Sequence, residues 1–134
     1  MKLVDRLGRL ALSAMFLQLS GPVARNPGKQ AATAGRLLAG ARSRLPVPVP
    51  GDELVVRLNA VAQVGAALGL TFDVAPRLSA GILLASLVPV SVAGHPFWTL
   101  DDPAQRVNHR IHFIKNLGVS GGLLLVLASR PAEH

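Results

Sequence analysis

The sequence predicts an all-α protein, a bundle of four transmembrane helices with a short interfacial helix in the first loop. Half of the 134 residues are hydrophobic, only 16% are charged, and the mean hydropathy is +0.42, which is high for a soluble domain. The charges gather between long uncharged runs, a pattern typical of membrane proteins. The length predicts one domain, residues 1–134. Buried helices of a soluble protein remain the alternative, because each run only just reaches the length of a span.

Four apolar runs supply the predicted spans: residues 7–24, 54–70, 76–93 and 111–128. The first run is expected to end at Gly21-Pro22, a pair that commonly breaks helices. Its basic start also fits a secretory signal peptide cleaved after Ala24. Asp5 and Gln18 interrupt the apolar character that such a signal needs, so a membrane span is the preferred interpretation.

The loop over residues 25–53 is the longest connection in the chain. Its middle, AATAGRLLAGARSRL, has a helical composition and carries Arg36, Arg42 and Arg44. A helix lying in the membrane interface would turn these side chains toward lipid headgroups. Alternating prolines from Pro46 to Pro50 then predict a stiff extended strut. A disordered linker is the alternative interpretation of this loop.

The second and third runs are predicted to be antiparallel neighbours, because only residues 71–75 separate them. Asp52 is expected to cap the second run, and Pro89 to kink the third. Small residues at a spacing of four favour close approach of helix backbones. These pairs are Gly65 and Gly69, Gly81 and Ala85, and Gly118 and Gly122.

The fourth run belongs to a longer helix, predicted over residues 103–128. Asp102 suits the cap and Pro103 the first helical position. This helix would be about 39 Å long, against about 30 Å for a bilayer core, so its first two turns are expected in the interface. Phe97 and Trp98, just before it, fit an interfacial aromatic belt.

A polar stripe on this helix is the main candidate for a functional site. Spacings of four, three and four place on one face Gln105, His109, His112 and Asn116. Because polar groups are costly in lipid, the stripe should face the bundle, where it could meet the second span. The hypothetical cofactor-binding pocket comprises His109, His112, Lys115, Asn116, Asn59 and Gln63. Such a pocket suits a quinone headgroup, since imidazoles relay protons and Lys115 can hold a carbonyl oxygen. Alternatively, the histidines are interfacial, Lys115 snorkels and Asn116 joins helices.

Other chemistries are not expected. The chain has no cysteine, which excludes disulfides, thiol chemistry, iron–sulfur clusters and thioether-linked haem. No metal site is expected, because His95 or Asp101 across a turn are the nearest third ligands for His109 and His112. Ser120 has no positioned His and Asp for a hydrolase triad. The net charge of +7 lies at the ends of apolar runs, which favours lipid headgroups over nucleic acid.

Two motifs resemble the DoxX family of small bacterial membrane proteins. They are G-H-P-F-W at residues 94–98 and H-F-I-K-N-L-G-V-S-G-G at residues 112–122. With the four short spans, the resemblance covers the whole chain in layout. It implies a four-helix bundle that crosses the bacterial inner membrane several times. Some relatives are tied to quinone-linked oxidation of sulfur compounds, or to membrane oxidoreductase complexes that handle oxidative stress. The resemblance carries over no catalytic residues.

The expected function is that of an accessory or scaffold subunit of a membrane oxidoreductase or respiratory complex. A chain without cysteine, haem ligands or a nucleotide motif cannot move electrons alone, so no cofactor is expected within it. The alternative is a quinone-binding subunit of a quinone-linked oxidoreductase that uses the polar stripe. The expected partners are the lipid bilayer and other membrane subunits or further copies of this chain, with no nucleic acid.

Overall fold

The computed structural model of the chain describes residues 3–45, 48 and 50–129, and within them it contains only helices, turns and loops. The elements are α1 (Leu3–Arg25), α2 (Gly28–Arg44), α3 (Asp52–Thr71), α4 (Pro76–Gly94), the 3-10 turn η1 (Phe97–Thr99) and α5 (Pro103–Ala128). The all-α prediction is confirmed. Each predicted span lies within one long helix, and the helix predicted in the first loop is α2. Pro46, at the start of the predicted strut, lies outside the described residues.

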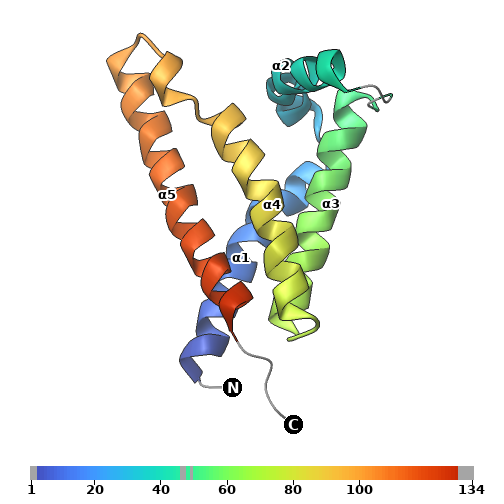
Figure 1. Cartoon of the computed structure of the whole chain (residues 1–134), viewed down its shortest axis with the longest axis vertical. Helices are drawn as coiled ribbons and strands as arrows, with labels where there is room; N and C mark the ends of the chain where they lie inside the picture. Colours follow the sequence, from blue (N-terminus) through green and yellow to red (C-terminus); the bar gives the residue numbers. More distant parts are fainter. Residues whose placement is uncertain (1–2, 46–47, 49, 130–134) are drawn as a thin grey trace.

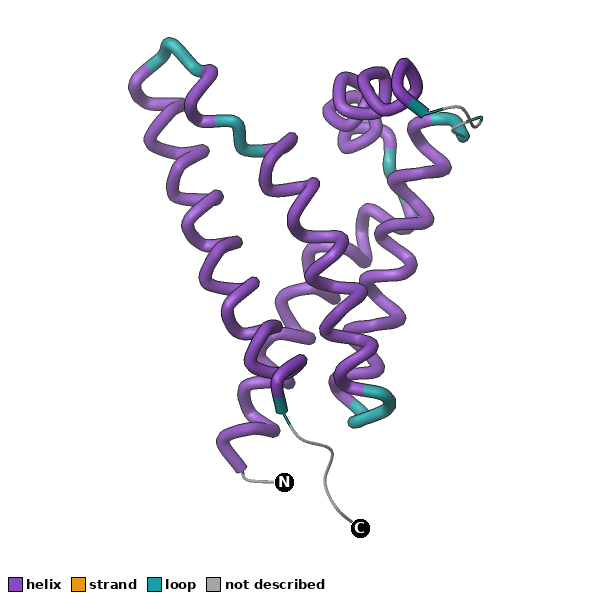
Figure 2. The backbone as a smooth tube through the Cα atoms, in the orientation of Figure 1, coloured by secondary structure: helices purple, strands orange, loops and turns teal. Residues whose placement is uncertain are grey.

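The four long helices form an open bundle (Figures 1 and 2). α3 packs along both α1 and α4, and α4 lies between α3 and α5. α5 also touches α1 where α1 begins and α5 ends, and the bundle splays apart toward its other end. α2 runs across the direction of the long helices and packs on α3 and α4. The fold therefore has a closed end, where α1 begins and α5 ends, and an open end at α2 and the α4–α5 turn.

Three of these helices are long and apolar enough to cross a membrane: Asp52–Thr71, Pro76–Thr99 and Pro103–Ala128. Leu3–Arg25 does not reach this threshold, although a span was predicted over residues 7–24. Arg9 and Gln18 lie in every 18-residue window of this helix and lower its average hydropathy. The expected break at Gly21-Pro22 was wrong, because α1 continues to Arg25. Pro22 lies in the last turn, where its missing N–H removes only one helical hydrogen bond.

Many large apolar side chains lie on the outside of the bundle, and its core combines large and small ones. Leu125 is 75% exposed, and Leu117 and Leu58 are more than half exposed. Such a surface is expected for helices that contact lipid rather than water. The buried core combines Phe16, four leucines and one valine with three alanines: Leu70, Leu83, Leu87, Leu123, Val126, Ala66, Ala67 and Ala80.

The turn between α3 and α4 forms an ion pair with α1 at the closed end of the bundle. Its backbone forms a Schellman motif, in which the N–H of Val74 donates to the carbonyl of Gly69 at 2.8 Å. Asp73 occupies the left-handed position of this motif, with φ of 58°, where glycine is the usual residue. Its carboxylate accepts a hydrogen bond from Arg9 Nη1 of α1 at 2.5 Å, and the Arg9 side chain is 9% exposed. This ion pair ties α1 to the turn.

The small residues predicted to pack helices divide into two groups. Gly69, Gly81 and Gly122 face neighbouring helices: a Cβ at Gly69 would overlap Ser79 Oγ of α4, and one at Gly122 would touch Leu12 of α1 at 3.4 Å. Gly65 and Gly118 face open space, because a Cβ at either would meet nothing within 4 Å. In each pair at this spacing, the close contact with a neighbouring helix is therefore made by one residue rather than by both.

Candidate functional site

The polar stripe of α5 enters the bundle at only one position. Asp102 caps the helix as predicted, accepting a hydrogen bond from the N–H of Ala104 at 3.2 Å. His109 and His112 are half-buried, and Asn116 is buried. Lys115 is exposed and does not join Asn116 inside the bundle.

Three histidines gather at the open end, where α4 passes into α5. The ring of His95, in the link after α4, lies 5.3 Å from that of His109 and 5.0 Å from that of His112, between centroids. The first pair meets edge to face and the second is stacked. The Nδ1 atoms of His95 and His109 are buried and have no hydrogen-bond partner in the described part of the chain. The three imidazoles therefore offer unused polar atoms at the end of the α4–α5 hairpin.

An aromatic cluster stands beside these histidines. Phe97, Trp98 and Phe113 contact one another edge to face, with centroids 5.1 to 5.8 Å apart. Phe113 comes from α5 and the other two from η1, so the cluster fastens the link to the helix. Trp98 remains 53% exposed, as expected for a residue of an interfacial aromatic belt.

The six residues of the hypothetical pocket do not assemble into one site. Asn116 Nδ2 donates to Ser91 Oγ of α4 at 2.9 Å, and Ser91 Oγ donates to the carbonyl of Leu87 at 2.7 Å. Gln63 is buried, and its Oε1 accepts a hydrogen bond from Ser20 Oγ of α1 at 2.5 Å. Asn59 is half-buried on α3. The predicted meeting of Asn59 and Gln63 with the α5 stripe was wrong, because α4 stands between α3 and α5.

Sequence reasoning considered His95 only as a third metal ligand across a turn and left it out of the hypothetical pocket. The short link between α4 and α5 was a usable signal for this residue. Such a link reverses the chain direction, so its residues lie beside the first turns of α5. Despite their proximity, no three His, Asp or Glu side chains among the described residues are placed to hold a metal ion. The imidazoles meet through ring faces and edges.

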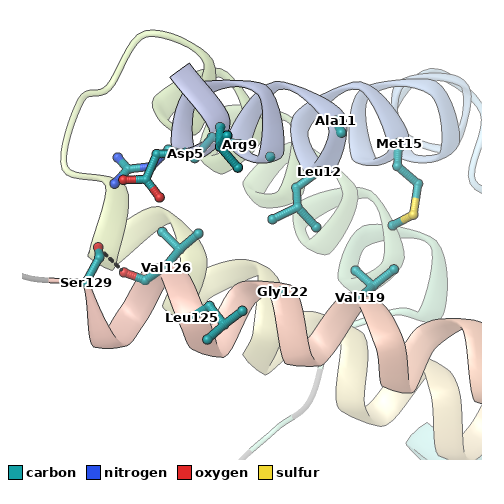
Figure 3. A pocket seen from close by; sticks show the side chains of 12 residues that line it. Asp5, Arg9, Ala11, Leu12, Met15, Val119, Gly122, Leu125, Val126 and Ser129 are labelled. Atoms are coloured by element: carbon teal, nitrogen blue, oxygen red, sulfur yellow. Dashed lines mark hydrogen bonds between the residues drawn. The ribbon is translucent and has the colours of Figure 1, made fainter. Parts of the chain in front are cut away.

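Sequence reasoning also missed a groove between α1 and α5 at the closed end (Figure 3). The groove has a volume of about 490 Å³. Its walls are apolar: Leu12, Met15, Val119, Leu125 and Val126. Gly8 and Gly122 leave room between the helices, and Asp5, Arg9 and Ser129 lie at one end. α1 and α5 come from opposite ends of the sequence, so no local pattern predicts their contact.

Comparisons with protein-family models, with curated proteins and with solved structures find no match to this chain.

Proposed function

We propose that this chain is a multi-pass membrane protein in which α1, α3, α4 and α5 all cross the bilayer. Three of them meet the length and composition of a span, and α1 packs along α3 more extensively than any other pair of helices in the described chain. A helix in contact with a span over much of its length shares its depth in the bilayer. Two polar side chains of α1 have partners on the α3 side of the bundle. Arg9 forms an ion pair with Asp73, and Ser20 donates a hydrogen bond to Gln63.

We propose further that α2 lies in the membrane interface. Ala31 is buried, and Gly35 and Leu38, which follow it on the same helical face, are half-buried. Arg42 extends this attachment, with Nη2 at 2.7 Å from Asp52 Oδ1 at the start of α3. Lys29, Arg36 and Arg44 are exposed and lie away from that face. This polarity supports contact between the basic surface and lipid headgroups.

The role that the geometry supports best is that of an accessory or scaffold subunit of the DoxX type, beside an oxidoreductase in the bacterial inner membrane. One observation carries the scaffold role: the buried amides are used to join helices. Asn116 binds Ser91 and Gln63 binds Ser20, and such pairs stabilise helix association in lipid. The oxidoreductase as partner follows from the family resemblance, and the partner would supply the electron-transfer groups.

A quinone-binding redox subunit is the second candidate function. It is favoured by the histidine cluster, defined by His95, His109 and His112, because two buried Nδ1 atoms there have no partner among the described residues. An imidazole can exchange hydrogen bonds and protons with a quinone oxygen. In this form of the hypothesis His95 takes the place that Asn59 and Gln63 were expected to fill.

One experiment separates the two roles. We expect Asn116→Leu to weaken the α4–α5 contact by about 0.5–2 kcal/mol and to reduce recovery of the oxidoreductase complex after gentle detergent extraction. We expect His112→Ala to leave that complex intact, with unchanged quinone-linked turnover. Asn108→Leu is the matched control, because it removes an exposed amide from the same helix. The measurements are the subunits recovered with the tagged chain and the rate of quinone reduction by the extracted complex.

Two outcomes would contradict the proposed scaffold role or the proposed association. If His112→Ala abolishes quinone reduction while the complex assembles normally, the redox role replaces the scaffold role. If the wild-type chain is extracted without any oxidoreductase subunit, the proposed association is wrong.

A further inference from the structure

The groove between α1 and α5 has a length suited to one leaflet of a bilayer. Its lining on α1 extends from Val4, near the closed end of the bundle, to Met15. Met15 lies eleven residues after Val4 in the same α-helix, which corresponds to about 16 Å. A bilayer core is about 30 Å thick, so the groove reaches from one membrane face to about the midplane. A neighbouring helix would need a groove of the full thickness, whereas a lipid chain needs only this half.

The groove changes in polarity along its length. Its inner part is walled by Leu12, Met15 and Val119, and its outer end carries Asp5, Arg9 and Ser129 (Figure 3). Ser129 Oγ donates its one hydrogen to the carbonyl of Val126 at 2.6 Å, so toward a ligand it can only accept a hydrogen bond. The charged groups available to a ligand at this end are a carboxylate and a guanidinium.

The two charged groups at the mouth differ in exposure: Asp5 is exposed, whereas the Arg9 side chain is 9% exposed and reaches a ligand only from within the groove. Arg9 uses Nη1 for Asp73, its one side-chain hydrogen-bond partner in the described chain, and a guanidinium has five N–H donors. Asp5 is exposed and forms no ion pair with any described residue. Because Arg9 is also paired with Asp73, which lies outside the lining, two carboxylates stand against one guanidinium at this end. A headgroup that carries an ammonium group beside its phosphate matches this balance. A purely anionic headgroup would meet repulsion from Asp5, and an uncharged one would leave both groups unused.

We propose that this groove binds one phospholipid with a zwitterionic phosphoethanolamine headgroup. One acyl chain lies between α1 and α5, the phosphate contacts Arg9, and the ammonium contacts Asp5. The proposal requires the membrane location argued above but is independent of the oxidoreductase partner and of the histidine cluster.

Glycines that face open space provide a matched pair of variants. Gly8 lines the groove, and a Cβ there would meet nothing within 4 Å, so Gly8→Leu fills the groove without a clash at Cβ. Gly118 of α5 is equally open but lies outside the groove lining, so Gly118→Leu adds the same side chain elsewhere. Ala11→Phe is a second groove-filling variant, from an exposed lining position.

The test uses the full chain in nanodiscs of equal phosphatidylethanolamine and phosphatidylglycerol with matched acyl chains, followed by detergent extraction and native mass spectrometry. We expect the wild type and Gly118→Leu to retain one phosphatidylethanolamine per chain. Gly8→Leu should reduce this retention about tenfold, the factor expected when about two methylenes lose their place in an apolar site. Asp5→Asn should lower the preference for phosphatidylethanolamine over phosphatidylglycerol about threefold.

The opposite results would overturn the proposal. Equal retention by wild type and by both groove-filling variants excludes this groove as the site. Retention of phosphatidylglycerol, of a quinone or of a second protein chain in place of phosphatidylethanolamine shows a different occupant. A wild-type chain that fails to enter the nanodisc removes the proposed membrane location as well, whereas one that enters but retains no lipid removes the lipid site alone.

Discussion

Replacing Gly69 by leucine is expected to force α3 and α4 apart at the closed end and to lower stability by about 3 kcal/mol. Even a Cβ at this position would overlap Ser79 Oγ and lie 3.1 Å from the carbonyl oxygen of Val74. The backbone has little freedom to retreat, because the N–H of Val74 donates to the carbonyl of Gly69 at 2.8 Å. Ser79 is itself buried, so its side chain must move within a packed interior.

Two variants show whether this close approach is the cause. Gly65→Leu, one turn earlier in α3, adds the same side chain where a Cβ meets nothing within 4 Å, and its unfolding temperature should stay near the wild-type value. Gly69→Ala should destabilise less than the leucine variant, and adding Ser79→Ala should restore much of that loss by removing the overlapping hydroxyl. Thermal unfolding in detergent micelles, followed by helical circular dichroism, is the measurement. Equal losses for the variants of Gly65 and Gly69 would contradict the explanation.

Local signals in the sequence predicted where the helices lie, although α1 continues past Pro22 and Asp52 begins α3 rather than capping it. Asp102 followed by Pro103 marks the start of α5, and the predicted helix over residues 103–128 matches Pro103–Ala128. Caps, prolines and apolar runs act over a few residues, so they can be recognised without knowledge of the neighbouring helices. The small-residue spacing was informative for the same reason, although it could not distinguish Gly69, which meets α4, from Gly65, which does not.

The candidate sites depended on contacts that no local pattern contains. The stripe of α5 was correctly expected to bury Asn116, yet its partner is Ser91 of α4 rather than an amide of α3. Gln63 also has a buried partner, but that partner is Ser20 of α1. A helical wheel identifies the face that avoids lipid, whereas the order of helices around the bundle decides which residues meet there.

The ion pair between Arg9 and Asp73 gives the second large expected effect. Asp73→Asn should lower stability by about 1–3 kcal/mol, because it leaves the Arg9 guanidinium without its anionic partner. The loss should fall below the roughly 3–5 kcal/mol for a fully buried pair, since the Asp73 side chain is 50% exposed while that of Arg9 is 9% exposed. Asparagine tolerates the left-handed backbone at this position, with φ of 58°, so the change removes charge without adding strain.

The Asp73→Gly variant distinguishes the contribution of the ion pair to stability from the effect of the left-handed backbone at this position. Glycine favours the left-handed position of a Schellman motif, so a turn limited by strain would become more stable with it. If the carboxylate stabilises the fold through its contact with Arg9, the glycine variant should instead unfold at a lower temperature than the wild type. Arg6→Gln provides the control, because it removes a positive charge from an exposed position of α1. A stabilised Asp73→Gly chain, or a loss as large for Arg6→Gln as for Asp73→Asn, would mean that this contact does not hold α1 to the turn.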